Sequence, residues 1–329
     1  MSLVSVVVPV YNEQDTVPTF YERAAKILER SGMDWEIIFA LDPCTDQTKS
    51  VILDLRDRDQ RVKLLEFSRR FGQPAATLAG LAASSGDAVV VIDVDLQDPP
   101  ELILRMIDRW RVGYDVVYAQ RRTREGETLP KRIVAALGYR VIKRVAEVEI
   151  PPNTGDFRLM SRRVVDHVVA LNEAHGFLRG LVALVGFRQT SIQYDRDARA
   201  AGASKYNRFF GSIYIGLNGI VSFSRYPLQL ISIAGLLSAL LAFLLATGYL
   251  VAKLAGASFP LGNPTIVIIV SLFSGLQLLS LGIMGEYVGR IYDEVKRRPK
   301  FIVDQAYGIE ARAPREGAED VRERYGLEA

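Results

Sequence analysis

Short apolar runs rich in β-branched residues alternate with longer amphipathic stretches through residues 1–200. Such short runs predict buried strands, and the amphipathic stretches between them predict helices. The predicted strands are Leu3–Val10, Trp35–Leu41, Val62–Phe67, Ala88–Asp93 and Asp115–Ala119. The predicted helices are about Gln14–Arg30, Asp46–Arg58, Pro74–Ser84 and Pro100–Arg111. This alternation predicts an α/β fold with a doubly wound, mostly parallel sheet and helices on both of its faces.

The pattern changes after about residue 205, where two long apolar stretches follow. Leu228–Ala252 and Thr265–Met284 contain no Asp, Glu, Lys or Arg. Each is long enough to cross the ~30 Å hydrocarbon core of a bilayer as a helix. We therefore expect a hairpin of two transmembrane helices. The alternative is a buried hairpin in a soluble core, which seldom tolerates two uncharged segments of this length.

Basic residues flank the two stretches unevenly. Lys253 stands alone near the intervening loop, whereas Arg208, Arg225, Arg290 and the run Lys296–Lys300 lie on the other sides. The positive-inside rule then predicts cytoplasmic termini and a plasma-membrane protein. The start of the chain has no basic n-region and no cleavage site, so we expect no signal peptide.

Four parts are expected along the chain. They are a catalytic domain (1–205), a juxtamembrane amphipathic helix (206–227), the two spans with their short loop (228–285), and a basic juxtamembrane segment with the C-terminal tail (286–329). The amphipathic helix is expected to lie in the membrane interface, and an ordinary core-facing helix is the alternative. The tail beyond Phe301–Val303 is charged and is expected to be loosely ordered.

Composition excludes several classes of site. The net charge of +3 is too small to indicate nucleic-acid binding. The single cysteine, Cys44, excludes an intramolecular disulfide, and with only His167 and His175 the chain has no cysteine–histidine zinc set. Neither a P-loop nor a GxGxxG motif occurs.

Acidic residues follow the predicted strands. Glu13, Asp42, Asp93 and Asp95 lie at or just after strand ends, and in a parallel sheet these ends share one edge where ligands bind. Within Asp93–Gln97, two carboxylates and an amide oxygen are suitable ligands for Mg²⁺ or Mn²⁺. Because an Asp-x-Asp pattern also arises by chance in a chain of this length, the metal-site interpretation depends on the position of the motif directly after a strand.

Three further segments are candidates for binding or catalysis. Asp156, in the polar cluster Asn153–Arg158, is a candidate general base or substrate-orienting group, and an Asp–Arg pair that holds a turn is the alternative. Arg199–Lys205 has the glycine, hydroxyl and cations of a phosphate cradle, or is a basic patch at the membrane surface. The basic run Arg121–Arg132 is a solvated face or a second phosphate-binding surface.

Several ordered motifs between residues 3 and about 303 resemble the polyprenyl-phosphate branch of the family-2 glycosyltransferases, which have a GT-A fold. That branch includes bactoprenol glucosyltransferases and dolichol-phosphate mannose synthases. The matching motifs are Val8–Glu13, Asp42 with Asp46, Ser68–Gly72, Asp93–Pro99, Gly155–Arg162, Arg199–Tyr206, Gly285–Tyr292 and Arg298–Lys300. The chain departs from the family pattern at Leu41, Pro43, Cys44 and Arg70.

The resemblance implies an inverting, metal-dependent transfer of a sugar from a nucleoside diphosphate, for which we expect UDP, to undecaprenyl or another polyprenyl phosphate. It implies nucleotide contacts by Pro9, Tyr11, Glu13, Asp42, Gln73 and Asp93. Asp93, Asp95 and Gln97 would hold Mg²⁺ or Mn²⁺, and Asp156 and Asp93 would be catalytic. Arg121, Lys131, Arg199, Ser204 and Lys205 would bind the acceptor phosphate. The family also suggests a homo-oligomer such as a tetramer.

Two other functions are weighed against this one. A processive polysaccharide synthase usually has a Gln-x-x-Arg-Trp motif and more spans, but Arg109-Trp110 is preceded here by Met106. A catalytically decayed, nucleotide-sugar-binding membrane protein is the second alternative, and the changes at Leu41–Cys44 favour it.

Overall fold

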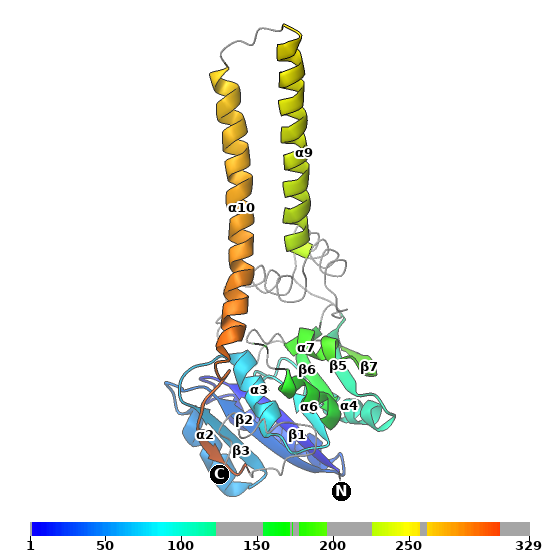
Figure 1. The fold of residues 1–329 in the computed structure, drawn as a ribbon. Coiled ribbons are helices and arrows are strands. Elements are labelled where there is room, and N and C mark those ends of the chain that lie inside the picture. The colour runs from blue at the N-terminus through cyan, green and yellow to red at the C-terminus, as the bar shows by residue number, and fades with distance from the viewer. Residues whose placement is uncertain are drawn as a thin grey trace.

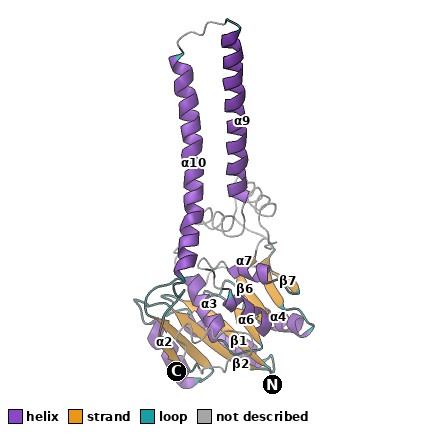
Figure 2. Cartoon of the chain, viewed as in Figure 1, coloured by secondary structure: helices purple, strands orange, loops and turns teal. Residues whose placement is uncertain are grey.

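The structure is a computed structural model that describes residues 2–122, 154–171, 173, 178–195, 226–256 and 262–309. A sheet covered by helices on both faces forms one part, and two long helices extend away from it side by side (Figures 1 and 2). The expected α/β class is therefore confirmed.

Eight strands form one sheet in the order β7-β5-β6-β4-β1-β2-β3-β8. Their bounds are β1 Leu3–Val10, β2 Asp34–Leu41, β3 Val62–Phe67, β4 Ala88–Val91, β5 Val116–Arg121, β6 Thr154–Ser161, β7 Gln189–Tyr194 and β8 Val303–Tyr307. β1 pairs in parallel with β2 and β4, β2 with β3, and β5 with β7. β6 and β8 run antiparallel to their neighbours, so the sheet is mostly parallel, as expected.

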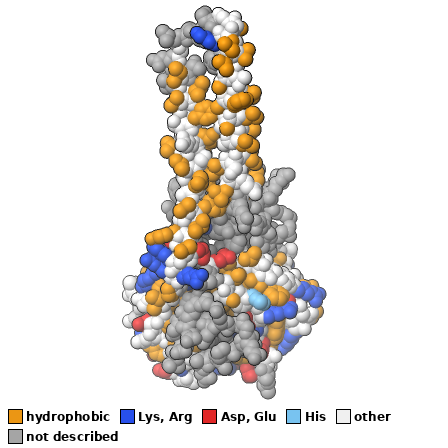
Figure 3. All heavy atoms as spheres, in the orientation of Figure 1, with side chains coloured by type: hydrophobic (Ala, Val, Ile, Leu, Met, Phe, Trp, Pro, Cys, Tyr) orange, Lys and Arg blue, Asp and Glu red, His pale blue; other side chains and the backbone are white. Residues whose placement is uncertain are grey.

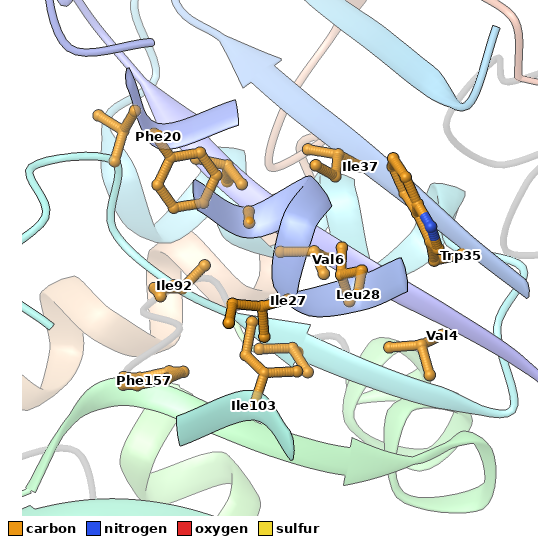
Figure 4. Packing of buried hydrophobic residues seen from close by; sticks show 14 of the residues in the cluster. Val4, Val6, Phe20, Ile27, Leu28, Trp35, Ile37, Ile92, Ile103 and Phe157 are labelled. Atoms are coloured by element: carbon orange, nitrogen blue, oxygen red, sulfur yellow. The ribbon is translucent and has the colours of Figure 1, made fainter. Parts of the chain in front are cut away.

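Helices cover the two faces of the sheet in two groups. One face carries α1 (Val17–Glu29), α2 (Thr48–Arg58) and α4 (Leu102–Arg111), and the other carries α3 (Gln73–Ala83), α6 (Arg162–Ala170) and α7 (Leu178–Val185). Successive β1 residues point to opposite faces, so Val6 belongs to one core and Val7 to the other. Figure 4 shows the first core, where Phe20, Ile27 and Leu28 of α1 pack near Val6.

The two long helices are α9 (Tyr226–Leu254) and α10 (Asn263–Lys296). The most apolar part of α9 has a mean hydropathy of 2.4, and none of it is buried. Large side chains such as Leu236 and Phe243 are exposed along it, and Figure 3 shows apolar atoms along both helices. In the described residues, α9 is the helix that meets the length and composition needed to cross a membrane. A hairpin buried in a soluble core is not what the structure shows.

The predicted strand bounds agree closely with β1 to β5, but three strands were not predicted. The polar segment around Asp156 is not a turn: β6 inserts between β4 and β5 in the middle of the sheet. β7 lies at one edge of the sheet. β8 lies at the other edge, next to β3, so the chain returns from α10 to the sheet. The expectation of a loosely ordered tail beyond Val303 is therefore wrong as far as Tyr307, where β8 ends.

Candidate active site

The carboxyl ends of β1, β2 and β4 lie at one edge of the sheet. β1 pairs with β2 as far as Val10 and Leu41, and the two chains leave the sheet together. Pairing with β4 ends earlier, at Val7 and Val91. Pro9 lies inside β1, buried, beyond that pairing, where its missing N–H does not interrupt the ladder with β4. The loops after these strands carry the residues expected to contact the nucleotide sugar, which would be the donor in the expected reaction.

Asp42 anchors a loop that follows the neighbouring strand β3. Its carboxylate accepts hydrogen bonds from the backbone N–H groups of Phe71 and Gly72, each at 2.9 Å, and its side chain is buried. The backbone of Gly72 has φ of 88°, which favours glycine. We name residues 68–73 the donor loop. Through these two hydrogen bonds, Asp42 holds the donor loop in place. This structural role is separate from the nucleotide contact expected of Asp42.

The donor loop reaches two other candidate residues. The guanidinium carbon of Arg70 lies 4.0 Å from the centre of the Tyr11 ring, which follows β1. Three residues on, the side-chain amide of Gln73 donates to Oδ1 of Asp93, after β4, at 2.7 Å. The structure therefore brings Tyr11, Asp42, Gln73 and Asp93 together along one edge.

Glu13 belongs to the turn that joins β1 to α1. Its backbone N–H donates to the hydroxyl of Thr48 at 2.9 Å, and its carboxylate accepts from the hydroxyl of Thr16 at 3.0 Å. These contacts fasten the start of α1 to the start of α2. Glu13 therefore joins the starts of two helices, beside the sheet edge that carries the candidate site.

The departures from the family pattern are accommodated locally. Leu41 is 1% exposed and belongs to the core, so this departure places an apolar side chain in the packing between sheet and helices. Cys44 Sγ accepts from the backbone N–H of Asn12 and donates to the carbonyl of Asp42, both at 3.1 Å. Burial raises the pKa of the Cys44 thiol, which therefore packs as a neutral group.

The turn Asp93–Gln97 is the candidate metal site. Oδ1 of Asp95 accepts from the backbone N–H of Gln97 at 3.1 Å, and Asp95 is 9% exposed. Leu96, between them, has φ of 56°, a left-handed conformation that costs a branched residue of order 1 kcal/mol. Strain of this kind is found where a turn is held for function.

The chemistry of this turn fits a hard divalent cation. It offers two carboxylates and one amide oxygen, the ligand types that Mg²⁺ and Mn²⁺ take in proteins. Among the described residues, no group of three or more His, Cys, Asp or Glu side chains is arranged to hold a metal. A cation at Asp93, Asp95 and Gln97 would therefore need further ligands from substrate phosphates or water.

Two buried side chains, Tyr194 and Asp98, hold the partly exposed Arg121 beside this turn. The hydroxyl of Tyr194, on β7, donates to Oδ1 of Asp98, and Nε of Arg121, at the end of β5, donates to the same hydroxyl at 3.2 Å. Asp98 is 2% exposed, and a guanidinium nitrogen of Arg121 lies 3.8 Å from it. Burial and the Asp98 carboxylate raise the pKa of Tyr194 to about 12, so its phenol keeps its proton.

Asp156 lies on β6 among arginines. Nε of Arg179 donates to its Oδ1 at 2.9 Å, and the Asp156 side chain is 30% exposed. Burial disfavours its charge, but the charges of Arg179, Arg158 and Arg121 outweigh burial and hold the Asp156 pKa below its ordinary value. Asp156 is thus paired with Arg179 of α7 and not with a neighbouring arginine that holds a turn, and its carboxylate is ionised at neutral pH.

Arg158 lies on the same strand and is almost fully buried. It donates to the backbone carbonyl oxygens of Gly155 at 2.9 Å and Asp156 at 3.4 Å. Burial lowers the pKa of Arg158 to about 10, so it stays charged at neutral pH. Arg121, Arg158 and Arg179 therefore create a positive field around Asp156, a field suited to a phosphate.

Sequence reasoning missed Asp98, Tyr194 and Arg179, and it included Arg158 only as a member of the polar cluster Asn153–Arg158. Asp98 stands inside the matched Asp93–Pro99 motif, so a signal for it was available. Tyr194 and Arg179 carry no local signal, because only the fold brings them to β5 and β6. The other acceptor candidates, Lys131, Arg199, Ser204 and Lys205, and the amphipathic segment 206–225, lie outside the described residues.

Comparison with known proteins defines the class. The family model described as glycosyl transferase family 2 matches residues 5–169. The chain belongs to this family, and the match includes every donor-site candidate named above. Together with the mostly parallel sheet, this confirms the GT-A-like α/β class and makes the protein a glycosyltransferase.

Relatives extend the similarity beyond the family domain. The uncharacterized glycosyltransferase YkcC of Bacillus subtilis is 45% identical over 306 residues, 93% of this chain and 94% of that one. The SfII prophage-derived bactoprenol glucosyl transferase of Shigella flexneri is 39% identical over 305 residues, 92% of this chain and 98% of that one. A solved glucosyl-3-phosphoglycerate synthase of Mycobacterium tuberculosis covers 66% of this chain and 78% of its own at 19% identity. Its TM-score of 0.44 is too low to bear on the site.

Proposed function

We propose that this glycosyltransferase moves a sugar from a UDP-sugar to a polyprenyl phosphate, with inversion at the anomeric carbon. The observation that carries the proposal is the extent of similarity to a bactoprenol glucosyl transferase, which covers 92% of this chain, whereas the family model ends at residue 169. The similarity therefore includes most of the chain that follows the family domain, where the two long helices lie.

The donor would bind along the edge formed by Tyr11, the donor loop and Asp93. Tyr11 offers a ring face, already stacked with Arg70, to a base or ribose. Asp42 holds the donor loop in place, and Gln73 orients Asp93. Asp93, Asp95 and Gln97 would hold Mg²⁺ or Mn²⁺, which when bound neutralises charge on the departing nucleoside diphosphate.

The acceptor phosphate would bind near Arg121, on the side of the turn where Arg158 and Arg179 add positive charge. A phosphate monoester has a second pKa of about 6 and is largely ionised at neutral pH, so its attack needs no strong general base. Asp156 is held as an anion by Arg179 and has a low pKa. We therefore assign Asp156 to orienting the arginines and the acceptor rather than to removing a proton.

The two long helices would hold this edge at the membrane. α9 is apolar and unburied along its length. After α10, the chain enters the sheet at the carboxyl end of β3, the same edge that carries the site, since the backbone N–H of Ser68 donates to the carbonyl of Ile302 at 3.1 Å. The proposal thus includes two spans, a cytoplasmic catalytic domain, and a phosphorylated lipid that meets the sugar at the bilayer surface. A homo-oligomer, such as a tetramer, belongs to it by family resemblance.

One experiment tests the reaction. The purified full chain is incubated with undecaprenyl phosphate and a panel of radiolabelled nucleotide sugars, with and without Mn²⁺, and the lipid is extracted. Label in the lipid fraction, dependent on the cation and on one nucleotide sugar, is the expected result. Label in a long water-soluble polymer would indicate a processive synthase, and nucleotide-sugar binding without any product would indicate a decayed site.

A further inference from the structure

The segment that follows α10, residues 297–307, packs against the sheet and pairs with it. α10 ends at Lys296, and Arg297 takes a left-handed conformation that turns the chain. Nζ of Lys300 then donates to the carbonyl of Leu171, at the end of α6, at 2.8 Å. Phe301 is 1% exposed and belongs to the core that contains α3 and α6. β8 follows at once and pairs with β3.

Phe301 begins a row of three aromatic side chains that ends in the donor loop. Its ring centre lies 6.1 Å from that of Phe67, the last residue of β3, at a tilt of 55°. Phe67 in turn meets Phe71 edge to face, also at 6.1 Å. These separations lie in the range in which aromatic rings attract one another. Because Phe67 and Phe301 are both about 1% exposed, neither ring has room to move without the other.

The row meets the residues of the donor site directly. The backbone N–H of Phe71 donates one of the two hydrogen bonds that the Asp42 carboxylate accepts. Gln73, two residues further along the chain, donates to Asp93. The pairing of β3 with β8 also shifts register between Glu66 and Phe67, just before the donor loop begins. Ring contacts from Phe301 to Phe71, followed by the chain from Phe71 to Gln73, thus connect the segment after α10 to the candidate metal turn.

We propose that Phe301 is a positioning residue for the donor nucleotide, acting through Phe67 and Phe71 on the donor loop. The proposal rests on the proposed function, because it assigns the donor loop to the UDP-sugar. The C-terminal segment is then part of the support of the donor site, and α10, the second proposed span, is tied to donor binding. Without the Phe301 ring, Phe67 loses one of its packing partners, and the ring of Phe71, whose backbone N–H donates to Asp42, is less firmly held.

Phe301→Ala tests the proposal in the full chain, with UDP as the binding probe. The KM for the donor and the Kd for UDP should rise about three- to tenfold, the range that loss of an aromatic contact implies. The kcat at saturating donor and the KM for undecaprenyl phosphate should stay within about twofold of wild type, since the acceptor side is untouched. Phe301→Leu, which keeps most of the volume, should restore part of the affinity.

Ile302→Ala is the matched control. Its side chain is 50% exposed, and its backbone carbonyl still accepts from Ser68, so donor affinity should be unchanged. Where Phe301→Ala does not fold, Phe71→Ala replaces it, because Phe71 is only half-buried and its backbone N–H is kept. Phe71→Ala and Phe301→Leu should then combine non-additively, since the two rings act through one contact row.

Hydrogen exchange supplies a readout that a loss of stability alone would not give. UDP should slow exchange in 301–307 as well as in 68–73 of the wild type, because coupling between two sites is reciprocal. In the Phe301→Leu variant, UDP should still slow hydrogen exchange in residues 68–73 but should slow it less in residues 301–307. Equal increases in the KM for donor and acceptor, or UDP protection that never reaches 301–307, would overturn the inference. A wild-type chain that binds no UDP would instead refute the proposed function.

Discussion

The side-chain amide of Gln73 donates a hydrogen bond of 2.7 Å to Oδ1 of Asp93. Gln73 is the first residue of α3, and Asp93 follows β4, so this contact joins the start of a helix to the candidate metal turn. The amino end of a helix carries partial positive charge, which favours a nearby carboxylate. Asp93 is thereby oriented before any ligand arrives.

Replacing Gln73 should weaken catalysis more than folding. Gln73→Ala removes the hydrogen bond to a partly exposed carboxylate, and we expect kcat/KM to fall roughly tenfold, as a lost bond to a charged group of about 1.5 kcal/mol implies. Gln73→Glu places a second negative charge against Asp93 and should lower kcat/KM further. The measurement is the initial rate of lipid labelling, and a Gln73→Glu variant at least as active as Gln73→Ala would count against this contact.

Asp95→Ala should abolish transfer while leaving the fold intact. The variant removes a carboxylate from the candidate cation site, and we expect the rate to drop by at least about 100-fold, a loss of several kcal/mol of charge stabilisation. The thermal midpoint and the far-ultraviolet circular dichroism should change little. Asp57→Ala, an exposed aspartate on α2, is the control and should retain full activity. Normal turnover by Asp95→Ala would remove Asp95 from the metal site.

Gly155→Ala should disturb the acceptor side alone. A Cβ built at Gly155 would lie 3.2 Å from Nη2 of Arg121, closer than most such contacts, and would push the flexible end of that side chain. We expect the KM for undecaprenyl phosphate to rise a few-fold, roughly the effect of misplacing one phosphate contact, while the Kd for UDP stays constant. Steady-state kinetics against each substrate separate the two, and an equal effect on both would show that Arg121 does not serve the acceptor alone.

The charge state of Asp156 makes a prediction about pH. Its pKa is held below the ordinary 3.8, chiefly because the surrounding arginines outweigh the effect of burial. Its ionised form therefore stabilises the folded state at any pH above the ordinary value, and that stabilisation disappears as pH falls through the lower, folded value. The stability difference between wild type and Asp156→Asn should be full from pH 5 to 8 and should shrink below about pH 4.

The same variant tests the catalytic role of Asp156. If Asp156 orients the arginines, Asp156→Asn should slow transfer by about tenfold or more and leave the shape of the pH–rate profile unchanged near neutrality. Loss of an acid limb from that profile would instead identify Asp156 as a general base.

Sequence periodicity predicted the strands in which apolar residues dominate and did not predict the more polar strands. β1 and β3 were predicted residue for residue, because apolar residues dominate both, although β3 also contains Lys63 and Glu66. β6 was missed because Asp156 and Arg158 interrupt its pattern. Their burial is tolerated only because Arg179 and backbone carbonyls lie beside them, which local sequence does not reveal.

The candidate site was predictable in part for the same reason. Strand ends of a parallel sheet share an edge, so the convergence of Asp42 and Asp93 followed from the alternation of elements. The contact between Asp98 and Tyr194 joins β7 to the turn after β4 and depends on the order of strands in the sheet. Both hydrogen bonds of the Asp42 carboxylate go to the donor loop, a structural role that the motif alone does not indicate.

β8 has a consequence for how this protein is made. The strand that closes the β3 edge is synthesised after α9 and α10, so the sheet stays incomplete until both helices have left the ribosome. A chain cut before α9 would present β3 as a bare edge, which is a template for aggregation. A water-soluble version of the catalytic domain therefore requires residues 298–309 to be rejoined to it through a linker in place of the helices.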